Sequence, residues 1–318
     1  MNHTSTPIKG RFAPSPSGRM HLGNVLCALL SWVSAKAKGG KVVLRIEDLD
    51  RDRCPRKYAD TLEEDLRWLG LTYDEGGSNG GPHASYYQSE RDEIYEAYFE
   101  KLRDRIYPCF CSRAALHAAS APHLSDGRII YAGTCRDMTA EQIAEASKTR
   151  TPSWRIRVPE RTITFTDHIQ GFQTMDLAAE CGDFIVRRAD GVFAYQLAVV
   201  IDDALMGINE VVRGRDLLTS TPQQIWLYEA LGFPVPQFYH IPLITAPDGR
   251  RLSKRDKDLD LLVLREKYTA EELIGLLAHL CGQTEKQESL TAKELASVFD
   301  WNKVPTEDIR LTESFYHA

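Results

Sequence analysis

The loop at residues 11–24, RFAPSPSGRMHLGN, combines two prolines and two glycines with a histidine, His21. Short loops usually need only one turn residue, so this composition favours a shaped binding surface. The loop ends where a helix is expected to begin. Backbone N–H groups and the helix dipole favour phosphate at such a position. These residues therefore indicate an anion site, with His21 as a candidate hydrogen-bond donor.

The familiar phosphate-binding motifs are missing from the sequence. It contains neither G-x-x-x-x-G-K-[ST] nor G-x-G-x-x-G after a strand, so ATP would have to be bound by another scheme. A second basic stretch, RLSKR, lies far downstream at 251–255. Taken singly, His21 could merely cap a helix and RLSKR could be a solvated basic turn. Only the two together favour a nucleotide site.

Three of the seven cysteines, Cys109, Cys111 and Cys135, lie close together in the sequence. Tetrahedral zinc would need a fourth ligand. Ordinary zinc chemistry makes His117 and His123 candidates for it. The alternative is three buried thiols without a metal, because a Cys-x-Cys pair alone is a weak signal. The odd number of cysteines argues against a disulfide framework.

The composition is typical of a globular protein, with 43% apolar and 26% charged residues. No apolar run approaches the roughly 18–20 residues of a membrane helix. The N-terminus lacks the apolar core of a secretory signal. The formal net charge of −6 argues against a general nucleic-acid coat protein. We therefore expect a cytoplasmic protein, monomeric and without a membrane partner.

The apolar pattern predicts an α/β fold with a parallel sheet. A strand at 8–13, a helix from Leu22 to the Gly39–Gly40 pair and a strand at 41–48 form an expected βαβ unit. Ligands of such sheets bind beyond the carboxyl ends of the strands, where the first loop lies. The other expected elements are helices at 56–69, 89–105 and 216–232, a strand-rich region at 152–200 that runs into GVFAYQLAVVIDD (191–203), strands at 208–214 and 239–246, and mostly helix thereafter.

The first loop and RLSKR together resemble the two signatures of class I aminoacyl-tRNA synthetases, the HIGH-type and KMSKS-type loops. The first reads His21-Leu22-Gly23-Asn24, and RFAPSPSG followed by LRIEDLD is similar to the glutamyl branch of that family. The resemblance implies a Rossmann-like catalytic domain that holds ATP, with Mg²⁺, between the loops. The residues it implies are His21 and Lys254 for catalysis, and His21, Gly23, Asn24, Ser253 and Lys254 for ATP binding.

Glutamate would need partners for two carboxylates and one ammonium group, and arginine is the residue suited to bidentate carboxylate binding. The positions that match glutamate contacts of the family are Arg11, Ala13, Ser15, Glu47, Tyr195 and Arg213. Glu47 suits the ammonium group, and which arginine takes which carboxylate stays open. Taken singly, Glu47 could be a solvated strand end, Tyr195 a core residue and Arg213 the partner of a nearby acid.

The related family also has a tyrosine four residues before its last cysteine as the fourth zinc ligand, and here that residue is Tyr131. The implied ligand set is Cys109, Cys111, Tyr131 and Cys135. Four protein ligands leave no position for water or substrate, so one structural Zn²⁺ is expected.

The chain after Lys254 is short, and it is expected to build a helical extension rather than a further anticodon-reading domain. This organisation resembles the glutamyl-Q tRNA(Asp) synthetase family, which activates glutamate with ATP and transfers it onto the queuosine base in the anticodon loop of tRNA(Asp). The implied parts are a first catalytic half at 1–106, an insertion with the zinc site and an acceptor-type subdomain at 107–190, a second catalytic half at 191–250, and the KMSKS-type loop with the helical extension at 251–318.

Three other functions stay open from the sequence. The acidic DKDLDLL after Lys254 resembles the ordinary glutamyl enzyme. The first alternative is therefore a truncated glutamyl-tRNA synthetase that charges a tRNA 3′ end. A second alternative is a ligase with a small-molecule acceptor. The third is a non-catalytic paralogue that binds tRNA or glutamate. The intact ATP loops argue against the last one.

Overall fold

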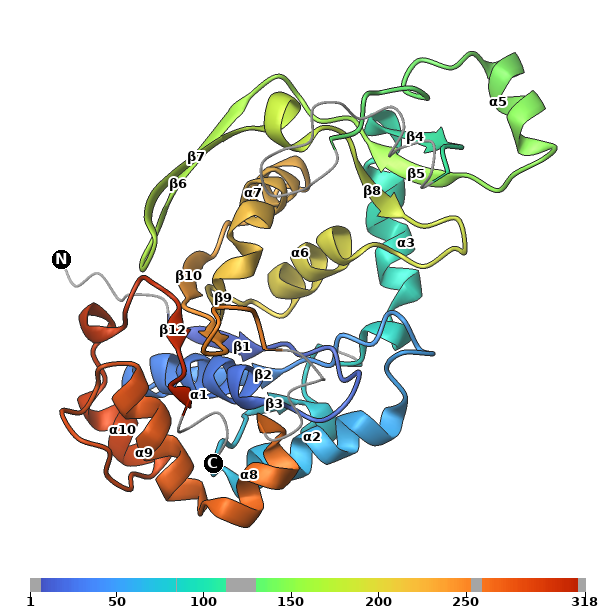
Figure 1. Cartoon of the computed structure of the whole chain (residues 1–318). Coiled ribbons are helices and arrows are strands. Elements are labelled where there is room, and N and C mark those ends of the chain that lie inside the picture. The colour runs from blue at the N-terminus through green and yellow to red at the C-terminus, as the bar shows by residue number, and fades with distance from the viewer. Residues whose placement is uncertain (1–6, 84, 113–129, 253–258, 314–318) are drawn as a thin grey trace, which may run out of the picture.

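The centre of the molecule is a parallel five-stranded sheet with the order β10-β9-β1-β2-β3 (Figure 1). The structure is a computed structural model that describes residues 7–83, 85–112, 130–252 and 259–313. The strands of this sheet are β1 (Lys9–Phe12), β2 (Lys41–Leu44), β3 (Glu75–Gly76), β9 (Glu210–Gly214) and β10 (Gln237–Ile241). The α/β fold class with a parallel sheet is confirmed.

Helix α1 (Leu22–Ala37) connects β1 to β2 and packs on β1, β2 and β9. Most of its faces are buried, since it lies between the sheet and the C-terminal helices. The other helices associated with the two halves of this sheet are α2 (Arg56–Trp68), α3 (Asp92–Lys101), α6 (Tyr195–Leu205) and α7 (Thr221–Ala230). The first loop thus leaves the carboxyl end of β1 and enters the N-terminus of α1, as the sequence predicts.

The strand-rich interpretation of 191–203 is wrong over most of its length, because Tyr195–Leu205 forms helix α6. The segment from Leu197 to Asp203 is buried on all sides. When every residue of a short segment is apolar and buried, its sequence shows no polar–apolar alternation. Periodicity then cannot distinguish a helix from a buried strand. The tertiary environment therefore decides this element.

The chain between the two halves of the sheet forms a separate antiparallel structure (Figure 1). Its three-stranded sheet has the order β4-β5-β8. A hairpin, β6–β7, returns to the main sheet, where the His168 N–H donates to the Phe238 carbonyl of β10 at 3.0 Å. The elements are β4 (Ile106–Cys109), α5 (Ala140–Ser147), β5 (Ser153–Ile156), β6 (Thr162–Asp167), β7 (Gly171–Asp176), a π-helical turn (Leu177–Cys181) and β8 (Phe184–Arg187).

The C-terminal part is mostly helical, as expected, and packs against α1. The Trp301 indole N–H donates to Ser34 Oγ of α1 at 3.1 Å. Its elements are α8 (Leu261–Lys267), α9 (Ala270–Leu280), α10 (Ala292–Val298) and β12 (Ile309–Arg310), which pairs with β11 (Ile244–Thr245). Short 3-10 turns lie at Gly77–Asn79, Gln88–Glu90, Arg103–Arg105, Arg215–Ser220 and Trp301–Lys303. Within the described residues, no helix is long and apolar enough to cross a membrane.

The edge of the sheet requires a glycine at position 76. Gly76 has φ +94°, and a Cβ there would lie 1.9 Å from the Leu44 carbonyl oxygen of β2. Gly70 also has a positive φ, +71°, but a Cβ there would meet nothing within 4 Å. Gly76→Ala is expected to lower the free energy of unfolding by about 3 kcal/mol or more, because the strand must move. Gly70→Ala should cost only about 1–2 kcal/mol of backbone strain. Urea unfolding followed by circular dichroism measures both, and equal losses would contradict the steric argument.

Candidate active site

A cavity of about 770 Å³ opens at the carboxyl ends of β1 and β9. It is lined by the first loop, the N-terminus of α6 and the end of β9. The sequence-predicted residues that line it are Arg11, Ala13, Ser15, His21, Gly23, Asn24, Glu47, Tyr195 and Arg213. Ser253 and Lys254 lie outside the described residues. Arg251 and Leu252, immediately before them, line the same cavity.

His21 and Asn24 cap helix α1 reciprocally. His21 Nδ1 accepts from the Gly23 backbone N–H at 3.2 Å, and Asn24 Oδ1 accepts from the His21 N–H at 3.1 Å. A neutral His21 therefore carries its proton on Nε2, and the Asn24 amide nitrogen remains a donor. The departure from HIGH at Asn24 is explained locally, because an asparagine completes the cap and still offers N–H groups at the helix N-terminus. Both side chains thus suit a phosphate ligand.

The floor of the cavity is a cluster of buried charges. Arg45 Nη1 donates to Asp203 Oδ1 at 2.6 Å, and Arg45 Nη2 donates to Glu47 Oε1 at 3.0 Å. Arg11 Nε also donates to Asp203 Oδ1, at 3.4 Å, and Arg11 Nη1 donates to the Val212 carbonyl at 3.0 Å. All four charged side chains are at most 8% exposed. The cluster connects β1, the end of β2 and α6 beneath the cavity.

The two carboxylates of this cluster differ in their pKa values. Burial raises the pKa of Glu47, and the charges of Arg45 and Arg11 only partly oppose it. Burial also acts on Asp203, but the charges of Arg45 and Arg11 outweigh it and hold its pKa below the usual value. Asp203 is therefore the permanent counter-ion of the two arginines. Glu47 has one oxygen bound by Arg45, and it lines the cavity.

A buried histidine, His240, accepts a hydrogen bond from Arg213. Arg213 Nε donates to His240 Nε2 at 3.0 Å, and Arg213 Nη2 donates to Thr221 Oγ1 at 2.8 Å. The other ring nitrogen, His240 Nδ1, lies 2.6 Å from Asp167 Oδ2. Burial lowers the pKa of His240 to about 4 despite the nearby Asp167, and the Arg213 charge adds to this effect. His240 is thus neutral near pH 7.

Arg45, Asp203 and His240 were not predicted from the sequence. Arg45 and Asp203 carried a signal, because each is a charged residue next to a buried apolar run, in VVLRIED and AVVIDD. Charged residues are almost never fully buried unless they are paired. His240 carried no such signal, since histidine in a strand is ordinary and its partner Asp167 is remote in sequence.

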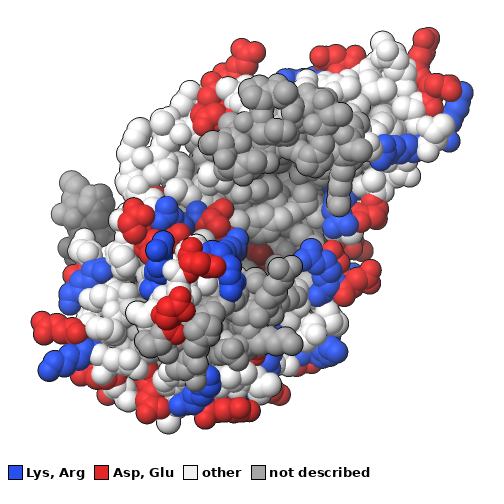
Figure 2. All heavy atoms as spheres, in the orientation of Figure 1, with Lys and Arg blue, Asp and Glu red and all other residues white. Residues whose placement is uncertain are grey.

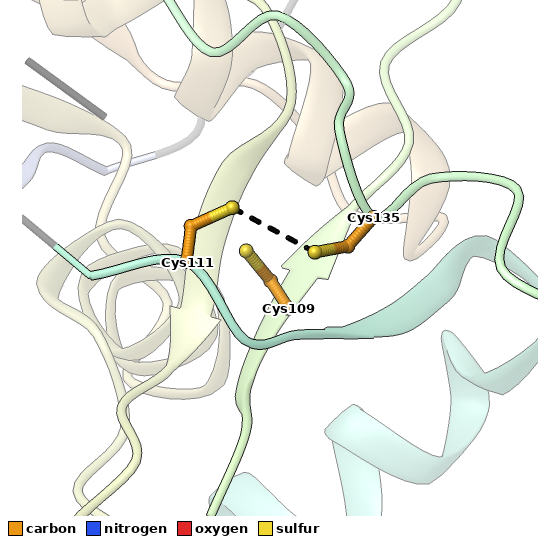
Figure 3. A group of neighbouring side chains, drawn as sticks. All are labelled: Cys109, Cys111 and Cys135. Atoms are coloured by element: carbon orange, nitrogen blue, oxygen red, sulfur yellow. Dashed lines mark hydrogen bonds between the residues drawn. The ribbon is translucent and has the colours of Figure 1, made fainter. Parts of the chain in front are cut away.

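The three clustered cysteines come together at the start of the inserted structure, and their sulfurs point toward one another (Figure 3). All three Sγ atoms lie within 4.8 Å of one another, and those of Cys111 and Cys135 are 3.7 Å apart. Tetrahedral zinc with Zn–S bonds of about 2.3 Å holds its sulfurs about 3.8 Å apart. The Tyr131 hydroxyl lies 3.5 Å from Cys109 Sγ and 4.0 Å from Cys111 Sγ. His117 and His123 lie outside the described residues, and the thiols with the phenol fit a small thiophilic ion.

Arg155 supports this cluster from β5. Its Nε donates to Cys109 Sγ at 3.3 Å, and its guanidinium carbon lies 3.8 Å from the centroid of the Tyr131 ring. Burial raises the pKa of the Cys109 thiol, but hydrogen bonds with Tyr131, the Cys111 N–H and Arg155 bring it below its usual value. Burial and the neighbouring thiols raise the pKa of Cys111 to about 11, so only Cys109 is shifted toward the thiolate. A lowered thiol pKa favours the thiolate, which is the form that binds metals.

Acidic and basic side chains are interspersed on the face shown in Figure 2. Nucleic-acid binding usually shows as a basic patch or stripe. Charge on the described residues of this face therefore does not by itself mark an RNA surface.

A parallel sheet with an anion-type loop at its carboxyl edge is the architecture expected of a class I synthetase. The chain belongs to the family described as tRNA synthetases class I (E and Q), catalytic domain, whose model matches residues 7–312. It is accordingly an aminoacyl ligase-type enzyme.

Comparison with individual proteins identifies more specific relatives within this family. The chain is 51% identical over 95% of its length to a Glutamyl-Q tRNA(Asp) synthetase of Symbiobacterium thermophilum, and 42% identical over 95% to one of Nitratidesulfovibrio vulgaris. It covers 95% of each of these relatives. A crystal structure of a glutamate tRNA ligase from Elizabethkingia meningosepticum in complex with its amino acid matches 98% of this chain and 68% of its own, with 31% identity and a TM-score of 0.83. The resemblance seen in the sequence is confirmed.

The buried charge cluster leads to a stability prediction. Asp203→Asn leaves Arg11 and Arg45 short of a counter-ion and is expected to lower the free energy of unfolding by about 3–5 kcal/mol at neutral pH. Because the pKa of Asp203 is lowered in the folded state, this loss should shrink as the pH falls through that lowered value. Asp216→Asn, which removes the partly exposed ion pair with Arg251, should cost about 1 kcal/mol or less. Urea titrations at several pH values test this, and equal effects of the two variants would contradict it.

Proposed function

We propose that the protein activates L-glutamate with ATP to glutamyl-adenylate and transfers the glutamate onto the queuosine base in the anticodon loop of tRNA(Asp). The observation that carries the amino-acid part is the charge of the cavity floor. The buried charged side chains that line the cavity are the guanidinium groups of Arg11 and Arg213 and the carboxylate of Glu47. Two positive charges and one negative charge complement glutamate, which has two carboxylates and one ammonium group. The acceptor follows from the relatives that bear that name and align over 95% of their length.

Glutamate binds through complementary charges. Glu47 receives the ammonium group with the oxygen that Arg45 leaves available, while Arg11 and Arg213 receive the two carboxylates. The Tyr195 hydroxyl, at the start of α6, lines the same cavity and is assigned as a donor to a carboxylate of the bound glutamate. Ala13 and Ser15 fit the ligand from the loop side, which is fixed to the strand end because the Glu47 N–H donates to the Pro14 carbonyl at 2.9 Å.

Activation joins a carboxylate oxygen of glutamate to the α-phosphorus of ATP, and the bond to pyrophosphate breaks. Negative charge gathers on the phosphate oxygens in the transition state, so positioned donors supply most of the catalysis. His21 Nε2–H and the Asn24 amide donate from the helix N-terminus, and Gly23 allows the nucleotide to approach the backbone. Lys254 and Ser253 are assigned to the departing pyrophosphate from the sequence. Mg²⁺ bound with ATP neutralises phosphate charge.

In the second half-reaction, a nucleophile of the queuosine base attacks the glutamyl carbonyl and AMP leaves. A specific observation also favours a second candidate, the charging of a tRNA 3′ end. The similar solved structure is that of a glutamate tRNA ligase. The two candidates share the glutamate and ATP sites and differ only in the acceptor.

We further assign a structural Zn²⁺ to Cys109, Cys111, Tyr131 and Cys135. The support is the spacing of the three sulfurs, the phenol beside them and the thiolate-favouring Arg155. Four protein ligands close the coordination sphere, so this ion stiffens the inserted structure and takes no part in the reaction. The four-part division of the chain, the cytoplasmic location and the monomeric state remain predictions.

Glutamate-dependent exchange of pyrophosphate into ATP tests activation. We expect exchange without any tRNA, and a loss of about a hundredfold or more in Lys254→Ala, because a transition-state cation is removed. Lys267→Ala, at an exposed position of α8, is the matched control and should leave exchange unchanged. Exchange that appears only with tRNA would favour the 3′-end candidate, and no exchange in either case would favour a non-catalytic paralogue.

Transfer of radiolabelled glutamate tests the acceptor. Label should enter tRNA(Asp) that contains queuosine and not the same tRNA with an unmodified guanine at that position. Removal of the 3′-terminal adenosine from the same tRNA should leave the transfer intact, because the expected acceptor lies in the anticodon loop. Labelling of tRNA(Glu) at its 3′ end instead would overturn the queuosine assignment.

Metal analysis of the purified chain tests the zinc assignment. We expect about one zinc per chain and a loss of most of it in Cys109→Ser and Cys135→Ser, because a thiolate ligand is removed. Cys54→Ser, which changes a buried cysteine outside the cluster, should retain the metal. Full zinc content in both Cys109→Ser and Cys135→Ser would contradict the assignment of these cysteines as zinc ligands.

A further inference from the structure

We propose that His240 and Asp167 are positioning residues for substrate carboxylate binding, because together they orient Arg213 without neutralising it. This inference rests on the proposed function, in which Arg213 receives a carboxylate of glutamate. Asp167 ends strand β6 of the inserted structure, whereas His240 lies on β10 and Arg213 on β9 of the main sheet. The proposal therefore gives the insertion a part in amino-acid binding.

The three side chains form one buried chain of hydrogen bonds. Asp167 is 1% exposed, His240 0% and Arg213 4%. The successive distances are 2.6 Å from Asp167 Oδ2 to His240 Nδ1 and 3.0 Å from His240 Nε2 to Arg213 Nε. Thr221 Oγ1 adds a second acceptor for Arg213 at 2.8 Å. A guanidinium fixed at two nitrogens has little rotational freedom left.

The hydrogen bonds of Arg213 to His240 and Thr221 occupy one edge of the guanidinium group, and the other edge is not used by them. Nε and Nη2 of Arg213 form the edge that faces His240 and Thr221. The remaining edge, with Nη1 and the second Nη2 proton, is the fork that binds a carboxylate in bidentate fashion. Because Arg213 lines the cavity, this fork is the part of the side chain available to a ligand.

The histidine between Asp167 and Arg213 has a particular electrostatic effect. A carboxylate bonded directly to Arg213 would compete with the substrate for the same charge. The neutral imidazole instead holds Arg213 by a hydrogen bond and leaves its positive charge for the substrate. The charges that face His240 are those of Asp167, Arg213 and Arg11, and the low pKa of about 4 agrees with a neutral ring among two guanidinium groups.

Asp167 sets the tautomer that this arrangement needs. His240 Nε2 must be unprotonated to accept from Arg213, so the ring proton must lie on Nδ1 and donate to Asp167. The carboxylate itself is fixed by backbone N–H groups. Asp167 Oδ1 accepts from Ile169 at 3.0 Å and from Gln170 at 2.8 Å, and both of its oxygens accept from the His240 N–H at 3.2 Å. Oδ2 is thereby directed at the ring.

These contacts make Asp167→Asn a sharp test. The backbone donors at Oδ1 will retain the amide oxygen there, so the amide NH₂ must face His240 Nδ1. The ring then accepts at Nδ1 and carries its proton on Nε2, where it opposes the Arg213 N–H. The substitution keeps the shape and reverses the tautomer, and a comparable reversal is known to be costly in a catalytic triad.

Two substitutions of His240 separate its hydrogen bond to Asp167 from its hydrogen bond to Arg213. His240→Asn places an amide near Nδ1, where it can donate to Asp167 but offers Arg213 no acceptor. His240→Gln places an amide near Nε2, where its oxygen can still accept from Arg213. A merely structural role of the histidine predicts similar effects of both variants on activity, in proportion to the stability that each loses.

The measurement is the pyrophosphate exchange rate as a function of glutamate and of ATP, with thermal unfolding of each variant. Asp167→Asn and His240→Asn are expected to raise the KM for glutamate about tenfold or more, since a hydrogen bond to a charged group is weakened or lost. The KM for ATP should change by less than about twofold. His240→Gln should raise the KM for glutamate by less than about threefold.

Arg213→Ala distinguishes failure of this inference from failure of the proposed function. If the wild-type chain shows no exchange, or if Arg213→Ala leaves the KM for glutamate unchanged, the proposed glutamate site itself is wrong. If Arg213→Ala raises that KM while Asp167→Asn and His240→Asn leave it unchanged, the positioning role is overturned. Equal changes in both KM values for Asp167→Asn would also overturn it, because they would indicate a general loss of structure.

Discussion

The burial of several guanidinium groups beneath one cavity is the constraint on which the rest of the structure depends. Arg11, Arg45 and Arg213 are each at most 4% exposed. Buried charges must be paired and hydrogen-bonded, so β1, β2, β9 and α6 have to meet at one place to supply the partners. The helix carrying Asp203 is therefore as much a part of the site as the loops that line it. Arg11 and Arg213 also line the cavity, so positive charge reaches its wall.

The sequence predicted the parts of this site that are local in the chain. The first loop, its strand and the capped helix follow one another directly, and turn chemistry and apolar period are properties of short segments. The resemblance then indicated Arg11, Glu47, Tyr195 and Arg213, which the structure brings to the same cavity. Cys109, Cys111 and Cys135 were grouped by their proximity in the sequence, and they do converge.

The remainder depends on contacts between distant segments, which no local pattern encodes. Helix α6 was mistaken for a strand because its buried residues show no amphipathic period. Asp203 pairs with Arg45 across 158 residues of sequence, and His240 meets Asp167 across 73. Such pairs can be identified only once the fold places their segments side by side. Residues that act through another side chain are therefore harder to predict than residues that touch the ligand.

The β6–β7 hairpin has a consequence for how this enzyme could be altered or could have diverged. Its last β6 residue, Asp167, is bonded to the main sheet through His240, and the hairpin loop also donates from Gln170 to the His240 carbonyl. The insertion is therefore not an exchangeable module. A chimera that took its insertion from a relative would keep the hydrogen bonds behind Arg213 intact only if the aspartate and its histidine were inherited together, so the two positions should be treated as one unit in recombination or design.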